Sequence, residues 1–176
     1  MRKDEIEKQA AALLAKLPTG GSPEVPIEAV ARQLGLPVIK ADLGEGVSGI
    51  LVTEGKRSYI GVQINDHIHR RRFSIAHEIA HYCLGHHRDE AVHVDQERTI
   101  SFRAIYRSTD SAGARKEVEA NQFAASLLLP EDRLTREVKE IRKARALTDV
   151  QIEELARRFK VSPAAMTIRL QVLKLM

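Results

Sequence analysis

The stretch FSIAHEIAHYCLG, from Phe73 to Gly85, decides how the rest of this chain is interpreted. It contains His77 and His81 four residues apart, with Glu78 directly after the first histidine. Because an α-helix turns by about 100° per residue, histidines four apart lie on one side, and both imidazoles can reach one tetrahedral Zn²⁺. Glu78 lies beside them, where a carboxylate can take a proton from a water activated by the metal. The stretch therefore predicts a metal-binding helix.

The apolar residues of this stretch indicate that the helix is buried along one side. Ile75, Ile79 and their neighbours fill a single arc of the helical wheel, and the two histidines border that arc. On the same wheel Glu78 falls on the open side, and Cys83 falls within the apolar arc as a small core residue. A metal at the floor of a cleft needs this arrangement. The alternative is an ordinary amphipathic helix that matches the pattern by chance.

A catalytic zinc of this type needs a third protein ligand and one open position. Downstream, the stretch KEVEANQFAASLLLP from Lys116 to Pro130 offers Glu117 and Glu119. On a helical wheel Glu119 falls on the solvent side, whereas Glu117 points into the apolar side with Asn121 one turn further on. A carboxylate on the apolar side is costly without a cation or hydrogen bonds. We therefore expect Glu117 to be the third ligand, with Asn121 as a supporting hydrogen-bonding group and Glu119 as the alternative ligand.

Two further histidines follow the helix. His87 stands at the offset of the third histidine in the longer pattern H-E-x-x-H-x-x-G-x-x-H. That pattern requires a glycine where this chain has Leu84, so the register fails by one residue. We expect Gly85 to end the helix, with His86 and His87 as charged or hydrogen-bonding groups near its end. A metal role for either histidine stays open.

The stretches RFSIAHEIAHYCLGH and EVEANQFAASLLLP together resemble the two motifs of the ImmA/IrrE family of intracellular metallo-endopeptidases. The likeness extends to PIEAVARQLGLPV, VSGILV and FKVSPAAMTIRL, and so covers the chain from about Val25 to Leu170. The resemblance implies an α+β, zincin-like domain in which Glu78 is the general base. It implies three zinc ligands, which are His77, His81 and Glu117.

The same resemblance implies a function, the hydrolysis of a peptide bond in a helix-turn-helix transcriptional repressor, with Zn²⁺ or alternatively Mn²⁺ as the cofactor. The departures from the family are Ser74 for Thr, Leu129 for Met, and a lengthened link between the motifs. Three other functions remain. They are a DNA-binding transcription factor with a vestigial metal site, a binding protein that does not hydrolyse, and a small-peptide aminopeptidase.

The composition is that of an ordinary soluble globular protein. The chain has 176 residues, of which 43% are hydrophobic and 30% charged, which suffices for one domain with its own core. A single cysteine excludes a disulfide within the chain. The first residues, MRKDEIEKQ, lack an apolar segment, and no apolar run reaches the length of a membrane span. We expect a cytoplasmic protein without a membrane partner.

We expect one domain with three parts. Residues 1–22 form a helical appendage, because helical periodicity from Asp4 to Leu17 ends at the breaker cluster Pro18 to Pro23. Residues 23–130 form the catalytic core, and residues 131–176 form a helical lobe.

A short helix and three strands precede the metal-binding helix. The expected bounds are Pro26 to Leu34 for the helix and Val38 to Leu43, Val47 to Thr53 and Tyr59 to Ile64 for the strands. The short turns between the strands favour an antiparallel meander. In zincins an edge strand of such a sheet pairs with the extended substrate backbone. Residues 47–52 are the candidate for that edge strand, although an ordinary core strand shows the same pattern.

The link between the two motifs contains the weakly alternating run from His93 to Ser108, which is typical of a strand or a flap. A tetrahedral oxyanion is stabilised by a donor opposite the base, and His93, Arg103 and Tyr106 are candidates for that donor. The sequence does not choose among them.

The region from Arg133 onward is basic. Within it Thr148 begins a capping box and a helix to about Phe159, and Ser162 caps another helix to about Lys174. The unit LARRFKVSPAAMTIRL looks like a helix-turn-helix, which favours a DNA-binding regulator as a competing hypothesis.

Two features argue against DNA binding. Lys160 stands where the turn of a helix-turn-helix usually has glycine, and the second helix carries few side chains suited to base edges. We therefore expect the lobe to help hold a protein substrate, without specific nucleic-acid binding. The triplet Arg70 to Arg72 is expected to be a solvated approach to the metal-binding helix.

Overall fold

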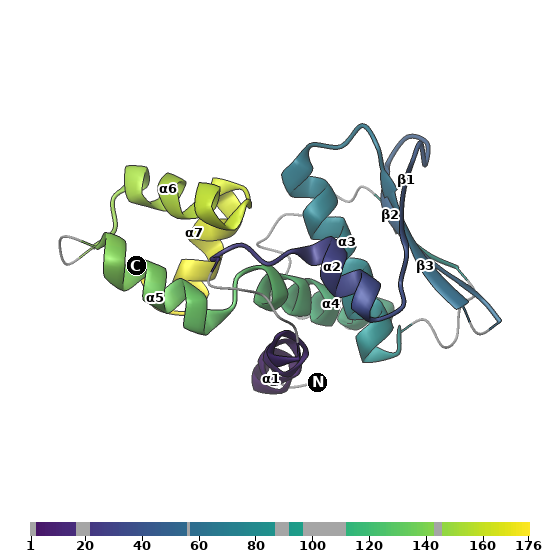
Figure 1. The fold of residues 1–176 in the computed structure, drawn as a ribbon, viewed down its shortest axis with the longest axis horizontal. Helices are drawn as coiled ribbons and strands as arrows, with labels where there is room; N and C mark the ends of the chain where they lie inside the picture. The colour runs from purple at the N-terminus through teal and green to yellow at the C-terminus, as the bar shows by residue number, and fades with distance from the viewer. Residues whose placement is uncertain (1–2, 17–21, 56, 87–91, 97–111, 143–145) are drawn as a thin grey trace.

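The computed structural model describes the chain except for residues 1–2, 17–21, 56, 87–91, 97–111 and 143–145. A small sheet lies at one end, two long helices lie in the middle, and three helices form the other end (Figure 1). The helices are α1 Lys3–Ala15, α2 Ile27–Gln33, α3 Ile68–Leu84, α4 Ala112–Leu128, α5 Glu131–Ile141, α6 Asp149–Phe159 and α7 Pro163–Val172. The strands are β1 Val38–Ala41, β2 Val47–Glu54, β3 Arg57–Gln63 and β4 Val92–Gln96. The predicted α+β class is confirmed.

The sheet has four strands in the order β1-β3-β2-β4. β2 and β3 form an antiparallel hairpin, and β4 pairs antiparallel with the other side of β2. β1 runs parallel to β3, with Val38 beside Ile60, so the predicted antiparallel meander is wrong for the first strand. Residues 42–46 connect β1 to β2, which are separated by β3 in the sheet. When extended, these residues can span more than the roughly 10 Å of two strand spacings, so the chain can cross past β3 before β2 begins.

The prediction that β2 is the edge strand is also wrong, because β2 lies between β3 and β4. The edges of the sheet are β1 and β4. β4 comes from the link between the two sequence motifs, so the first part of the weakly alternating run is a strand. The rest of that run, from residue 97 to residue 108, lies outside the described residues.

α3 lies against β2 and β3, and α4 packs along α3 (Figure 1). A cap at each end sets the length of α3. The side chain of His67 accepts a hydrogen bond from the backbone N–H of His69, and Gly85 ends the helix in the left-handed conformation at φ 71°. Gly85 is therefore the helix stop that the sequence predicts. The helix begins earlier than the quoted stretch and includes the arginine triplet.

One cluster of buried hydrophobic side chains runs through the molecule and includes Leu51, Ile79, Phe123 and Phe159. α1 packs on α4 and adds Ile6, Ala10 and Leu14 to this cluster. The N-terminal helix is therefore not an appendage. The breaker residues after it interrupt the helix, but its apolar stripe still finds a partner in α4.

The two C-terminal helices begin as the sequence predicts. Thr148 and Gln151 form the capping box of α6, and the Ser162 side chain accepts a hydrogen bond from the backbone N–H of Ala165 in α7. Between the helices Lys160 takes the left-handed conformation at φ 52°, the position that glycine usually occupies. Among the described helices, none is long and apolar enough to cross a membrane.

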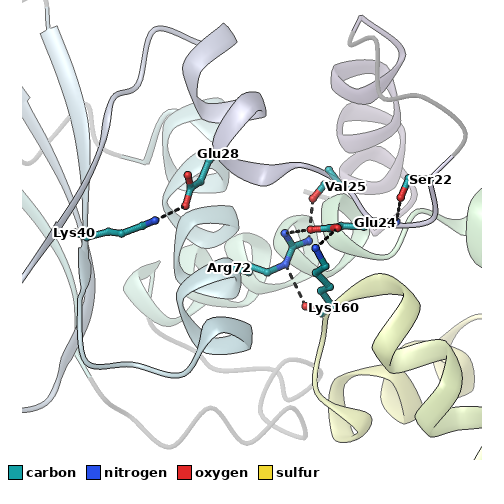
Figure 2. Close-up of polar contacts among 7 residues, drawn as sticks. All are labelled: Ser22, Glu24, Val25, Glu28, Lys40, Arg72 and Lys160. Atoms are coloured by element: carbon teal, nitrogen blue, oxygen red, sulfur yellow. Dashed lines mark hydrogen bonds and ion pairs between the residues drawn. The ribbon is translucent and has the colours of Figure 1, made fainter.

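Arg72 joins the C-terminal helices to the rest of the molecule (Figure 2). From α3 its guanidinium donates to the backbone oxygen of Lys160 at 3.1 Å, to Glu24 Oε1 at 2.9 Å and to the backbone oxygen of Val25 at 2.9 Å. Lys160 Nζ pairs with Glu24 Oε2 at 2.7 Å. The prediction of a solvated triplet is wrong for Arg72, which is buried because two segments distant in sequence, residues 24–25 and the turn at Lys160, close around it. In the same view the ion pair between Lys40 and Glu28 connects β1 to α2.

Candidate metal centre

Three side chains converge between α3 and α4. His77, His81 and Glu117 each place a ligand-type atom within 4.8 Å of the others. The two Nε2 atoms are 3.0 Å apart, and Glu117 places Oε2 3.3 Å from His77 Nε2 and Oε1 3.4 Å from His81 Nε2. Ligand atoms about 2 Å from a tetrahedral Zn²⁺ are about 3.3 Å apart. The three side chains therefore fit one metal ion of that size.

Their positions follow from how the two helices pack. His77 and His81 lie one turn apart on α3 and are buried, whereas the side chain of Glu117 on α4 is 40% exposed. The group is thus closed by α3 on one side and reaches solvent beside Glu117. A ligand or a water molecule can approach from that side.

The predicted exposures of the two carboxylates on α4 are reversed in the structure. The side chain of Glu117 is 40% exposed, and that of Glu119 is 15% exposed. The helical wheel treats the polar side of α4 as a solvent side. In the fold α1 packs on α4, Ser126 on that polar side is buried, and His86 covers Glu119. The predicted burial of Glu117 is therefore wrong, although Glu117 is still the carboxylate that meets the two histidines.

Glu78 is fully buried, which corrects its predicted place on the open side of the helix. Gly49 of β2 passes directly over it. A Cβ atom on Gly49 would lie 3.2 Å from Glu78 Oε1 and 3.2 Å from Ser74 Cβ. The sheet covers this side of α3. A helical wheel drawn for one segment takes no account of such contacts with other elements. A carboxylate in this position is shielded from bulk water.

His86 lies behind His81 and not within the group of three. Its Nδ1 is 3.3 Å from His81 Nδ1, its Nε2 is 3.5 Å from Glu119 Oε2, and its backbone oxygen accepts a hydrogen bond from Lys116 Nζ at 3.3 Å. Burial lowers the pKa of His86, and the charge of Glu119 opposes that shift. The sequence predicts His86 as a charged or hydrogen-bonding group near the end of the helix, but its contacts with His81 and Glu119 were not predicted. His87, the other histidine considered there, lies outside the described residues.

The remaining predicted residues have different outcomes. Asn121 lies one turn from Glu117 on α4, and its buried Oδ1 has no hydrogen-bond partner among the described residues. Cys83, predicted as a core residue, is exposed, because the last turn of α3 is less covered than the turns before it. Arg103 and Tyr106 lie outside the described residues, and His93 falls in β4 opposite Leu51. The oxyanion donor therefore stays a prediction.

Comparisons with known proteins agree with this architecture. The family model described as the IrrE N-terminal-like domain (Peptidase_M78) matches residues 31–171. A solved structure described as a Mycobacterium tuberculosis transcriptional regulator matches 96% of this chain with a TM-score of 0.62 and 22% identity. The chain spans 46% of that protein, so the likeness shows the shared fold alone. No curated protein sequence matches the chain significantly.

Proposed function

Because this chain belongs to the IrrE N-terminal-like family of peptidases, we propose that it is a zinc-dependent endopeptidase acting on a protein substrate. The observation that carries the proposal is the convergence of His77, His81 and Glu117 at the spacing of tetrahedral ligands. Two imidazoles and one carboxylate suit Zn²⁺, and Mn²⁺ is the alternative ion. Three protein ligands leave a fourth position for the reaction.

Each residue has a defined role in the proposed reaction. His77, His81 and Glu117 hold the ion, and Asn121 supports Glu117 from the next turn of α4. When bound, Zn²⁺ polarises the peptide carbonyl and makes water a stronger nucleophile near neutral pH. Glu78 accepts the proton of the attacking water and donates it to the leaving amine. Its burial beneath Gly49 supports this role, because a shielded carboxylate keeps one orientation.

We propose a helix-turn-helix transcriptional repressor as the substrate, on the strength of the family resemblance. An extended segment of that substrate would pair with β4, because β2 is an interior strand and β4 forms the edge beside it. The lobe formed by α5, α6 and α7 would contact the folded part of the substrate. With this division of roles, the scissile peptide would lie beside the sheet edge and the metal group.

The second candidate is a DNA-binding regulator, which the helix-turn-helix geometry of α6 and α7 favours. The charges of this region argue against it. Arg158 pairs with Glu137 at 2.9 Å and with Glu154 at 3.0 Å, and Lys160 pairs with Glu24 at 2.7 Å. Basic side chains that pair with carboxylates of the same chain are less available to DNA phosphates. Any DNA binding is therefore expected to be weak and steeply reduced by salt.

Metal analysis of purified variants tests the proposed function. We expect His77→Ala and His81→Ala to be folded but to hold well under one zinc per chain, because each loses a ligand. We expect Glu78→Gln to retain zinc and to lose cleavage of the proposed substrate, a helix-turn-helix repressor, because it removes only the base. The measurements are mass spectrometric metal content and gel-based cleavage with added Zn²⁺ or Mn²⁺.

His69→Ala is the matched control, since His69 lies on the same helix but outside the group of three. Zinc at wild-type content in both histidine variants would remove the metal site from consideration. Sequence-selective, salt-resistant DNA binding that survives Glu78→Gln, together with no cleavage, would favour the regulator.

A further inference from the structure

His81 has a close neighbour at each of its two ring nitrogens. On one side Nε2 lies 3.0 Å from His77 Nε2 and 3.4 Å from Glu117 Oε1. On the other side Nδ1 lies 3.3 Å from Nδ1 of His86. His86 in turn places Nε2 3.5 Å from Glu119 Oε2. His81, His86 and Glu119 thus form a continuous chain from the candidate metal site to a second carboxylate on α4.

The chemistry of imidazole determines where the protons of this chain lie. A neutral imidazole carries one N–H, so a histidine that binds metal through Nε2 keeps its proton on Nδ1. In His81 that proton faces His86 Nδ1, which must then be the acceptor. His86 consequently carries its own proton on Nε2, directed at the carboxylate of Glu119. Metal binding at one end and a carboxylate at the other select the same pair of tautomers.

We propose that His86 and Glu119 are positioning residues that hold His81 in its metal-binding tautomer and orientation. The inference rests on the proposed function, because it needs a metal ion at His81 Nε2. Outer partners of this kind fix the ring of a ligating histidine and raise its basicity. Neither residue belongs to the group of three that meets the metal spacing, so both act through His81.

The relay, by which we mean the chain of His81, His86 and Glu119, comes from the same pair of helices as the metal group. His86 follows Gly85, which ends α3, while Glu119 and Lys116 lie on α4. Lys116 Nζ donates to the backbone oxygen of His86 at 3.3 Å and so connects that residue to α4 at a second point. α4 therefore supplies Glu117 to the Nε2 side of His81 and Glu119 to the far side of His86. A change in the packing of α3 on α4 would disturb both at once.

Zinc affinity of the apoprotein, measured by competition with a chromogenic chelator, tests the relay. His86→Leu removes the acceptor and should weaken zinc binding about 10- to 100-fold. His86→Asn should restore most of the affinity, because its Oδ1 stands near the position of the lost Nδ1 and can accept from His81. Glu119→Leu should weaken binding as well, and Glu119→Gln should weaken it less because it keeps an acceptor oxygen. Glu45→Leu, at an exposed loop residue, is the control.

Ring-nitrogen NMR of the zinc-loaded wild type gives a readout that a merely structural role would not move. We expect the proton of His86 on Nε2 and the proton of His81 on Nδ1, and this measurement decides the question if a variant fails to fold. A proton on His86 Nδ1, or wild-type zinc affinity in His86→Leu, overturns the relay while cleavage by the wild type leaves the proposed function standing. Failure of the wild type to bind zinc overturns both.

Discussion

Gly49 is a residue at which the sheet and α3 approach each other closely. A Cβ atom there would lie 3.2 Å from both Glu78 Oε1 and Ser74 Cβ, which is tighter than ordinary contact. Glycine is thus favoured at this position, because a larger residue would crowd Glu78 and Ser74. The Glu78 carboxylate is the far end of a flexible side chain and can turn away, whereas Ser74 Cβ is attached directly to the backbone of α3, so the helix and β2 would have to separate slightly. At the scale of single residues, the position of the proposed base Glu78 depends on the absence of a side chain at Gly49 of β2.

Gly49→Ala should therefore reduce kcat about 10- to 100-fold while zinc affinity stays near that of the wild type. The added methyl group displaces the base and leaves the three ligand side chains untouched. Steady-state kinetics and chelator competition on the same preparation separate the two effects. Gly113→Ala is the control, because a Cβ on Gly113 meets no atom within 4 Å. A loss of zinc in Gly49→Ala would show that the strand supports the ligands as well.

At the scale of elements, α1 connects the first part of the chain to the last helix. Its apolar stripe packs on α4, and Glu7 forms a forked pair with Arg169 of α7. Arg169 is buried and also donates to the backbone oxygen of Leu129 at 3.0 Å. Burial raises the pKa of Glu7, but the hydrogen bonds and charge of Arg169 outweigh burial, so the pKa lies below its ordinary value of 4.5. The ionised form of Glu7 therefore stabilises the fold.

Because the folded-state pKa is lowered, this stabilisation is present above about pH 4.5 and is lost as the pH falls through the folded-state pKa. Glu7→Gln should cost about 1–3 kcal/mol in the free energy of unfolding at neutral pH, and the difference from the wild type should shrink below pH 4.5. Denaturant unfolding at a series of pH values measures this. Glu45→Gln is the control, and a difference for Glu7→Gln that is independent of pH would contradict the argument.

At the scale of the whole molecule, Arg72 connects α3 to the C-terminal lobe formed by α5, α6 and α7. Its three hydrogen bonds reach the neighbouring residues Glu24 and Val25 and the turn at Lys160, two segments that are far apart in the sequence (Figure 2). Burial lowers the pKa of the guanidinium, and the carboxylates of Glu24 and Glu28 oppose that shift. A buried cation with this many partners is costly to remove, because each partner is left without its donor.

Arg72→Ala should lower the free energy of unfolding by about 3–5 kcal/mol, and Arg72→Lys should recover only part of it because an ammonium cannot reproduce the planar fork. Chemical denaturation is the measurement. Arg32→Ala on the exposed side of α2 is the matched control and should stay within about 0.5 kcal/mol of the wild type. Equal stability of the two alanine variants would show that the lobe is held by apolar packing alone.

Features that depend on a few neighbouring residues could be predicted from the sequence by itself. The helix carrying His77 and His81, its end at Gly85 and the capping box at Thr148 all follow from periodicity and from local hydrogen bonds. The bounds of β1, β2 and β3 were predicted to within two residues for the same reason, whereas the run from His93 to Ser108 was not resolved into β4. His77 and His81 of the candidate metal group were equally readable, since their spacing on one helix is a local property. Glu117 comes from a second helix, so its meeting with the two histidines depends on how α4 packs on α3.

Tertiary structure alone decided the order of the strands, the burial of Glu78, the partial burial of Glu119, and the packing of Arg72 and α1. A helical wheel separates apolar from polar sides but does not say which polar side another element will cover. Here β2 covers Glu78, His86 covers Glu119, and two distant segments enclose Arg72. These contacts join residues that are far apart in the chain, so they depend on how whole elements pack against one another, a property that no short stretch of sequence contains.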